Sequence, residues 1–269
     1  MADKARKRPG DAIDLTEEGA SPQEKKMRAS INDVAADLLC PITQELPFDP
    51  VIAKDGKIYE RTAILEWFRK KDGDATSPST GKVIDTELVP AVQVRNTIES
   101  LIKSGAIEGE AAEAWREKLE QEKEVKEIRA KAEGGDAYSM WRIGVRYRQG
   151  VLGLAENAEL ARIWYERSAA ARDPMGMAAF GEALLHGVGG STDTSLGLVL
   201  VTEAATNGSD FAAYTLGKAF LEGNFGLTKD PVRARFWLVK ALGDCKFKHM
   251  SESGKANATR LLRELDAAE

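Results

Sequence analysis

The sequence predicts a multidomain protein, in which a small α+β module comes first, an all-α solenoid of helix-turn-helix repeats follows, and a charged helix joins them. Two short β-like runs surround the Asp55-Gly56 pair, and a helical apolar pattern comes after them. Residues 107–131 are dense in Glu, Lys, Arg and Ala, which are good helix formers. From residue 132 to residue 250, glycines and paired helical runs recur about every 36 or 37 residues, which is typical of a solenoid.

The composition excludes several classes of protein. With 269 residues, a formal net charge of −5 and 30% charged residues, the chain has room for two or three small domains and no overall attraction to nucleic acid. Its longest apolar run, residues 196–201, is far shorter than the roughly 18 residues that a membrane helix needs. The two cysteines, Cys40 and Cys245, give no disulfide framework, which indicates a reducing compartment. We therefore expect no nucleic-acid partner, no membrane partner and, since the first residues are charged, no secretory signal.

Residues 1–34 have few large apolar side chains and are expected to form a disordered arm. The basic cluster at residues 4–9, with a second half at Lys25, Lys26 and Arg28, is of the nuclear-import type, and a solvated charged tail is the alternative. We therefore expect the protein in the cytoplasm, the nucleus or both.

The same arm holds a short apolar and acidic stretch at residues 12–18. It resembles a SUMO-interacting motif, in which a short strand docks on the edge of a partner's sheet. Short patterns of this kind also occur by chance. The resemblance implies SUMO contacts from Ile13, Asp14, Leu15 and Thr16.

The module at residues 35–106 begins with a predicted hairpin over residues 51–59, since Asp-Gly favours a tight turn. A helix is expected from Arg61 to about Lys71, with a loop rich in Gly, Asp, Ser, Thr and Pro at residues 72–82 after it. A second helix is predicted by the spacing of Val94, Ile98, Leu101 and Ile102.

Several motifs of this module, in order, resemble the U-box, the zinc-free relative of the RING finger in ubiquitin ligases. They are Leu39-Cys40-Pro41-Ile42-Thr43, Asp49-Pro50-Val51, Tyr59-Glu60-Arg61, Ser77-Pro78-Ser79-Thr80-Gly81 and Leu88-Val89-Pro90. The resemblance implies a RING-type ubiquitin transferase that docks a conjugating enzyme loaded with ubiquitin and restricts the ubiquitin so that a lysine can attack. It implies no catalytic residue, no covalent intermediate and no cofactor, because catalysis is by positioning.

A zinc-based version of this fold is excluded by counting ligands. Two zinc ions would take eight Cys or His side chains, whereas the whole chain has two of each. If the chain has this fold, polar side chains and a packed core must brace the two loops, and Cys40 is expected to be a small buried residue. The candidates for bracing are Asp49, Tyr59, Glu60, Arg61, Ser77, Thr80, Arg95 and Asn96.

The resemblance also implies a docking groove for the conjugating enzyme. Ile42 would be its first-loop contact, Trp67 its helix contact and Pro78 its second-loop contact, with Gln44 beside the first. Ordinary packing is the alternative for each of them. Efficient RING-type ligases often have a cation or amide three residues after this proline, where this chain has Gly81. The resemblance then implies either a weak restraint on ubiquitin or a substitute cation from Lys82. Ala91 stands where the family usually has a loop-bracing Asn.

Residues 107–131 are expected to form a helical linker, either a solvated semi-rigid spacer or a coiled-coil contact of a homodimer. Trp115, Leu119, Val125 and Ile128 make only a broken apolar seam along it.

Residues 132–250 resemble three Sel-one-like repeats, relatives of the tetratricopeptide repeat. Gly144, Gly181 and Gly217 are 37 and 36 residues apart, and the same step relates Trp164, Val201 and Trp237. Asp136, Asp173 and Asp210 are 37 and 37 apart. The small residues among these, such as Gly144, permit helices to cross closely. Residues 251–269 are expected to form a capping helix. The resemblance implies a surface for a protein substrate or adaptor.

Together these patterns favour a U-box ubiquitin-protein ligase, whose partners are a conjugating enzyme, ubiquitin and a protein held by the repeats. A non-catalytic interaction scaffold with a degenerate U-box is the alternative, since Gly81 and Ala91 depart from the family pattern.

Overall fold

The computed structural model describes residues 34–70 and 74–267 of the chain. These residues divide into two compact units, with the boundary between Glu120 and Gln121. The nuclear-import cluster and the SUMO-interacting motif expected in the first 33 residues lie outside the described residues. Within the described part, no helix is both long and apolar enough to cross a membrane.

The first unit contains a three-stranded antiparallel sheet. Its strands are β1 (Pro50–Ile52), β2 (Ile58–Glu60) and β3 (Val89–Pro90), arranged in the order β2-β1-β3. Val51 pairs with Tyr59 on one side and with Pro90 on the other. The predicted hairpin is therefore confirmed, and Gly56 takes the positive φ of 75° that its turn requires.

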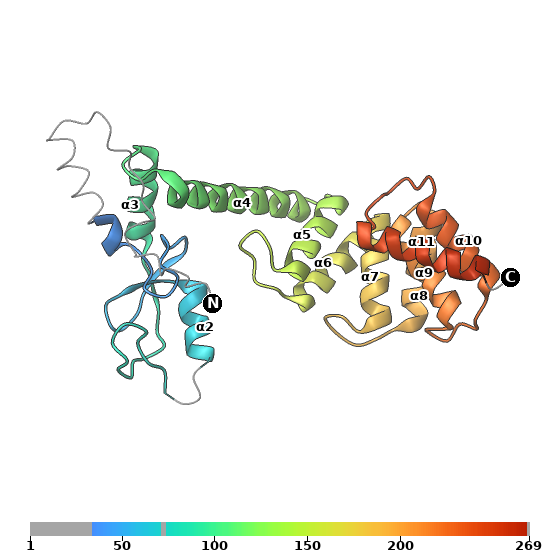
Figure 1. Ribbon diagram of the computed structural model, residues 1–269, viewed down its shortest axis with the longest axis horizontal. Coiled ribbons are helices and arrows are strands. Elements are labelled where there is room, and N and C mark those ends of the chain that lie inside the picture. The colour runs from blue at the N-terminus through green and yellow to red at the C-terminus, as the bar shows by residue number, and fades with distance from the viewer. Residues whose placement is uncertain (1–33, 71–73, 268–269) are drawn as a thin grey trace, which may run out of the picture. The chain divides into compact units, whose positions relative to one another are not determined.

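Two helices accompany the sheet, α2 (Arg61–Arg69) directly after β2 and α3 (Val92–Lys103) directly after β3 (Figure 1). The first buries Ile64 against Cys40, Val51, Ala53 and Tyr59. The second buries Ile98 and Ile102 in a separate cluster. The sheet thus has a small core of its own, which includes the predicted buried Cys40.

Helix α4 (Gly109–Glu133) covers most of the predicted linker, but the expectation of a solvated spacer is wrong for one of its faces. In the first unit, Trp115 is 2% exposed and packs with Ile98 and Ile102. In the second unit, Val125 and Ile128 are buried. The seam looked broken in the sequence because its two halves belong to two different cores.

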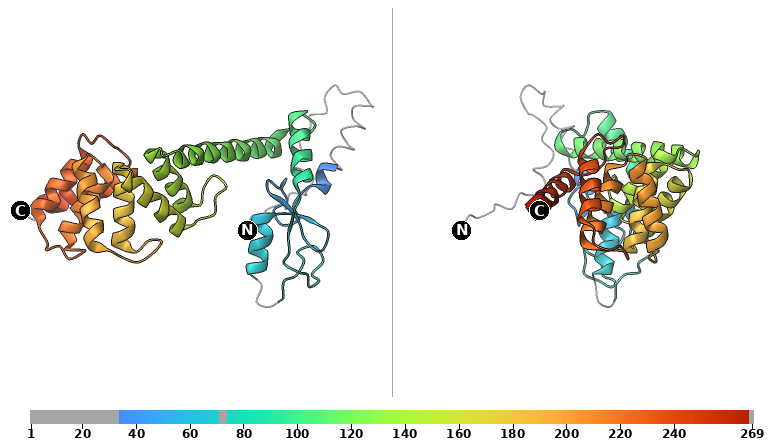
Figure 2. Two further views of the ribbon diagram at one scale, coloured as in Figure 1. Left: turned by 180° about the vertical axis from the view of Figure 1, so that it is seen from behind. Right: turned by 90° about the vertical axis from the view of Figure 1, so that its right-hand side faces the viewer.

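The second unit is a stack of helix pairs, which Figures 1 and 2 show side by side. Each consecutive pair packs closely, and each first helix also contacts the next first helix. This is the all-α solenoid that the period predicted. The helices are α5 (Ala137–Gln149), α6 (Ala158–Ala170), α7 (Pro174–His186), α8 (Thr194–Thr206), α9 (Asp210–Glu222), α10 (Pro231–Leu242) and α11 (Glu252–Ala267).

One glycine in each first helix lets the second helix approach. A Cβ atom added at Gly144 would lie 2.6 Å from Tyr165, and one added at Gly181 would lie 2.6 Å from Val201. At Gly217 the corresponding distance, to Leu238, is 2.7 Å. The prediction that glycine permits close helix crossing is confirmed, because a real Cβ would overlap the neighbouring side chain at all three sites.

Two of the predicted repeat positions need correction. The second helices begin at residues 158, 194 and 231, so Leu200, and not Val201, corresponds to Trp164 and Trp237. The sequence alignment slipped because the segment between α7 and α8 is one residue shorter than the equivalent segments. Asp136 and Asp173 are the N-caps of α5 and α7, whereas the N-cap of α9 is Ser209, so Asp210 does not occupy the position equivalent to the other two aspartates.

Asp210 is instead the first residue of α9 and is 2% exposed. Its carboxylate accepts hydrogen bonds from the backbone amides of His249 and Met250. This fixes the segment that leads into α11. Helix α11 then covers apolar side chains of α9 and α10, including Leu221 and Leu238.

Candidate docking site for a partner enzyme

The first loop of the α+β module presents Ile42. Backbone hydrogen bonds between Cys40 and both Gln44 (2.8 Å) and Glu45 (2.9 Å) close this loop. Gln44 has a φ of 60°, and its side-chain amide donates to the carbonyl of Pro41 at 2.8 Å. Ile42 is partly exposed and rests on the sheet core. It is therefore held in place without being sealed inside.

Helix α2 contributes Trp67, which is also partly exposed and packs against the same core. Its indole Nε1 donates a hydrogen bond of 2.8 Å to the backbone carbonyl of Thr76. This bond connects α2 to the second loop, two residues before Pro78. The indole thus combines a structural role with an exposed apolar surface, so packing and docking are compatible for this side chain.

The second loop presents Pro78 at its partly exposed surface. The preceding Ser77 is 1% exposed, and its hydroxyl accepts a hydrogen bond from the amide of Thr80 at 3.0 Å. The backbone amide of Ser77 donates to the carbonyl of Lys82 at 2.8 Å. These bonds fold the loop back on itself and fix the position of Pro78.

Asp55 ties this loop to the sheet, a role that the sequence did not reveal. Its Oδ2 atom accepts hydrogen bonds from the hydroxyls of Ser77, at 2.5 Å, and Tyr59, at 2.7 Å. Burial opposes ionisation, but the hydrogen bonds from Ser77, the amide of Lys57 and Tyr59 outweigh it and lower the pKa of Asp55 below its ordinary value. In the sequence, the turn at Asp55-Gly56 is enough to explain an aspartate at this position. The sequence therefore contains no sign that Asp55 also binds the second loop.

Other predicted bracing residues hold the first loop. The carboxylate of Glu60 accepts hydrogen bonds from the amides of Phe48, at 2.7 Å, and Asp49, at 3.1 Å. The guanidinium of Arg61 lies 2.7 Å from the carboxylate of Asp49. Arg95 lies over the ring of Phe48, with 4.3 Å between its guanidinium carbon and the ring centroid.

The remaining predicted braces act differently. Thr80 contributes its backbone amide, and Asn96 is exposed on α3. In the part of the chain that the structure describes, no group of three His, Cys, Asp or Glu side chains could hold a metal ion. The braces that the structure shows are hydrogen bonds in both loops and an ion pair in the first.

Gly81 and Ala91, the two residues that depart from the family pattern, lie in different surroundings, since Gly81 is exposed and Ala91 is buried. Gly81 is exposed, has a φ of 69°, and would have no atom within 4 Å of an added Cβ. Lys82 beside it is exposed as well. Ala91 is 3% exposed and begins α3 without a side-chain cap, while its own amide bonds to the carbonyl of Pro50 at 2.8 Å. Ala91 therefore ties the start of α3 to the sheet through its backbone alone.

These features define a class of protein: a small module braced by polar side chains and presenting three apolar residues, followed by a stack of helix pairs. The sequence matches the U-box domain family over residues 34–106. It matches the Sel1 repeat over residues 137–173, 174–209 and 210–242. The protein therefore contains a U-box domain followed by three Sel1 repeats.

Curated relatives match the U-box region. U-box domain-containing protein 18 of Arabidopsis thaliana is 44% identical over 72 residues, which are 26% of this chain and 10% of that protein. WD repeat, SAM and U-box domain-containing protein 1 of Danio rerio is 45% identical over 67 residues, 25% of this chain and 13% of that protein. The match thus spans about an eighth or less of these relatives, and the likeness concerns the U-box domain alone.

Two solved structures are similar to parts of this chain. A Sel1 repeat protein from Oxalobacter formigenes is 27% identical, with a TM-score of 0.40, over 51% of this chain and 98% of that chain. A protective antigen of uropathogenic Escherichia coli that displays an SLR fold is 22% identical, with a TM-score of 0.41, over 64% of this chain and 38% of that chain.

Proposed function

We propose that this protein is a RING-type ubiquitin-protein ligase. Its U-box domain docks a ubiquitin-loaded conjugating enzyme, and its Sel1 repeats hold a protein substrate or adaptor. The U-box domain is typical of ubiquitin ligases, and Sel1 repeats are typical of protein binding. The proposal goes beyond the family because it assigns the docking surface to Ile42, Trp67 and Pro78, with Gln44 and Lys82 at its edge.

One observation carries this assignment: three apolar side chains from three separate segments are each partly exposed and each fixed by local bonds. A surface whose loops are already ordered loses little conformational freedom when a partner binds. Ile42 and Trp67 share one supporting core, and the Trp67 indole is bonded to the loop that carries Pro78. These contacts support a preformed docking surface.

The proposed chemistry takes place on the partner enzyme. A substrate lysine amine attacks the thioester carbonyl of ubiquitin, an isopeptide C–N bond forms, the C–S bond breaks, and the conjugating enzyme's thiolate leaves. The U-box contributes by restricting the orientation of the loaded enzyme. Cys40 takes no part, because it is 0% exposed under the first loop. Lys82, which is exposed next to Gly81, would supply the cation that Gly81 lacks.

The test is reconstitution of the full chain with ubiquitin, activating enzyme and a panel of conjugating enzymes. Ile42→Ala and Pro78→Ala should each abolish self-ubiquitination while the circular dichroism spectrum is unchanged, since both side chains lie at the surface. Leu65→Ala on α2, where the side chain is 50% exposed, is the matched control and should retain activity. No conjugates with any member of the panel would favour the alternative, a non-catalytic scaffold.

A further inference from the structure

The Sel1 repeats contain a pocket of about 130 Å³ between the first helices of the second and third repeats. Helix α7 contributes Glu182 and His186 to its wall, and α9 contributes Tyr214, Lys218 and Glu222. Phe225, in the segment after α9, closes one side. Because two helices and a loop form its walls, a side chain inserted here would be enclosed from several directions.

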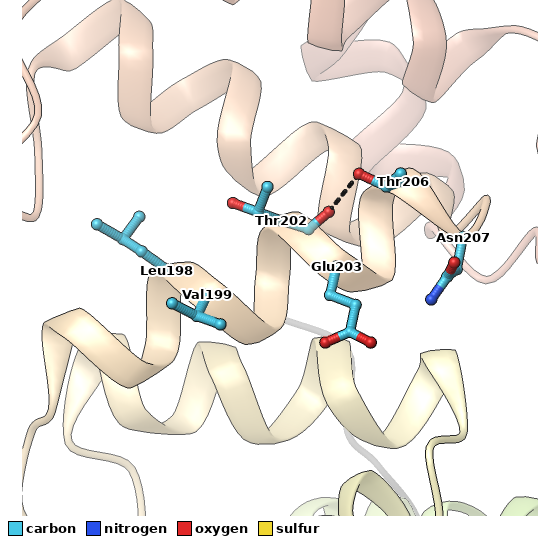
Figure 3. Close-up of a pocket in the computed structure, with 6 residues that line it drawn as sticks. All are labelled: Leu198, Val199, Thr202, Glu203, Thr206 and Asn207. Atoms are coloured by element: carbon cyan, nitrogen blue, oxygen red, sulfur yellow. Dashed lines mark hydrogen bonds between the residues drawn. The ribbon is translucent and has the colours of Figure 1, made fainter.

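A second depression, on α8, differs from this pocket because a single helix forms it (Figure 3). All six residues that line it belong to α8 or directly follow it, including Leu198, Val199 and Glu203. A single helix face leaves any ligand open to water. The carboxylate of Glu203 is already bound by Arg172 at 2.6 Å. The α8 depression is therefore not an enclosed pocket, and it serves as the control site for substitutions.

The aromatic walls of the α7–α9 pocket are fixed. Phe225 has a φ of 59°, a conformation that costs a non-glycine residue roughly 1–2 kcal/mol and persists only where its surroundings enforce it. Its ring meets that of His186 edge to face, with 5.2 Å between the centroids. The hydroxyl of Tyr214 accepts a hydrogen bond from the Asn257 amide at 2.5 Å. The wall of the pocket thus holds two ordered aromatic rings, and the ammonium of Lys218 already lies over the Tyr214 ring, 5.9 Å from its centroid, so this ring accepts a cation.

Glu182 gives the pocket its charge. Its carboxylate accepts no hydrogen bond and forms no ion pair within residues 34–70 and 74–267. Burial raises the pKa of Glu182, while Arg148 and Lys218 oppose the rise from a distance. With Glu222 and Lys218, the lining contains two acidic side chains and one lysine. Glu182 is half-buried and has no partner of its own among the described residues, so a cation that enters the pocket can bind its carboxylate without displacing another group.

We propose that this pocket receives the cationic side chain of a protein segment bound to the repeats, with arginine as the best fit. A guanidinium can stack on an aromatic ring while its planar N–H fork binds a carboxylate. Glu182 is the main partner, and Glu222, whose carboxylate accepts from Asn224 at 2.6 Å, lies at the same wall. The inference rests on the proposed function, since it names a recognition element of the protein that the repeats hold.

The probe for the test is Nα-acetyl-arginine N-methylamide, compared with the citrulline analogue, which has the same shape and no charge. Amide shifts of Thr215 and Ala219, which line the pocket, report binding to the full chain by nuclear magnetic resonance. The arginine probe should produce saturable shifts with a Kd of about 0.1–10 mM, a range suited to so small a ligand, and the citrulline probe should not.

Two variants complete the experiment. Glu182→Gln should weaken binding of the arginine probe by at least about tenfold, whereas Glu203→Gln, the same substitution in the α8 depression, should leave it unchanged. Equal shifts with both probes, no saturation, or undiminished binding to Glu182→Gln would overturn the proposal. Glu182→Gln removes a desolvated charge and keeps the side-chain shape, so it should fold. Failure here would leave ubiquitin transfer by the U-box intact, which separates the two proposals.

Discussion

The hydroxyl of Ser77 lies 2.5 Å from the carboxylate Oδ2 of Asp55, so the second loop of the U-box is bonded to the turn of the β1–β2 hairpin. The two residues are 22 positions apart. This hydrogen bond holds the loop that carries Pro78 against the sheet. In a RING finger, bound zinc ions have the corresponding structural role. The proposed docking surface therefore depends on Asp55, a polar residue that is not itself one of its proposed contacts.

Asp55→Ala should destabilise the U-box by about 2 kcal/mol, because Ser77 and Tyr59 both lose a charged hydrogen-bond acceptor. Chemical denaturation followed by a probe in the first unit measures this. Asp85→Ala is the control, since that exposed aspartate accepts only the local amide of Glu87. Equal losses in the two variants would contradict the bracing role.

The pH dependence of the same site follows from the sign of the shift. The pKa of Asp55 in the folded protein is below its ordinary value of 3.8. Its stabilising contribution is therefore complete above pH 3.8 and is lost as the pH falls through the lower, folded-state pKa. Acid unfolding of wild type and Asp55→Ala should converge at low pH, and a constant difference between them would argue against this contribution.

Gly81→Arg should accelerate ubiquitin transfer at a small cost in stability. The open space around this position accommodates a long side chain, but the φ of 69° costs any L-residue roughly 1–2 kcal/mol. Gly81→Ala carries the same backbone cost without the cation. A rate gain in the arginine variant alone would show that the missing cation limits transfer, while equal rates in both variants would show that Lys82 suffices.

Trp115→Ala should destabilise the first unit by about 3–5 kcal/mol, since this side chain of α4 is 2% exposed and packs on Phe48 with ring centroids 5.3 Å apart. Trp115→Phe should cost much less, because the indole Nε1 is buried without a hydrogen-bond partner and phenylalanine removes that donor. Thermal unfolding compares the two. Similar transitions for wild type and Trp115→Ala would mean that α4 is dispensable for the U-box core.

Gly181→Ala should cost about 1–3 kcal/mol by forcing α7 away from α8, where the new methyl would lie 2.6 Å from Val201. Adding Val201→Ala should recover part of this loss, because it removes the nearest colliding atom. The carbonyl of Gly197, 3.0 Å from the added Cβ, keeps the rescue incomplete. Strictly additive effects in denaturant unfolding would be inconsistent with this contact.

Glu182→Gln should stabilise the repeats at neutral pH. The pKa of Glu182 is raised above 4.5, so the folded protein loses stability as the pH rises from 4.5 through the folded-state pKa. The glutamine variant lacks this loss, and its advantage should vanish below pH 4.5. A variant that is less stable than wild type at pH 7 would mean that Arg148 and Lys218 more than offset the burial of the carboxylate.

Local patterns and counting predicted most of the fold. The Asp55-Gly56 pair predicted the β1–β2 hairpin, and the repeat of about 36 or 37 residues predicted the helix pairs. The count of two Cys and two His was enough to exclude a pair of structural zinc sites. The errors arose where a residue's role depends on distant neighbours. Ser209 takes the cap position, and Asp210 binds amides about 40 residues away. Likewise, the sequence around Trp115 does not show that it packs in the core of the first unit, and the sequence around Asp55 does not show that it binds the second loop.

The most direct test of the central claim is a single-turnover assay of ubiquitin discharge from a loaded conjugating enzyme to free lysine. It reads the U-box alone and needs no substrate on the repeats. Wild type should accelerate discharge, and Ile42→Ala should reduce the acceleration by at least about tenfold, because a central apolar contact is lost. Equal rates for the two proteins, or no acceleration with any conjugating enzyme tested, would contradict the account.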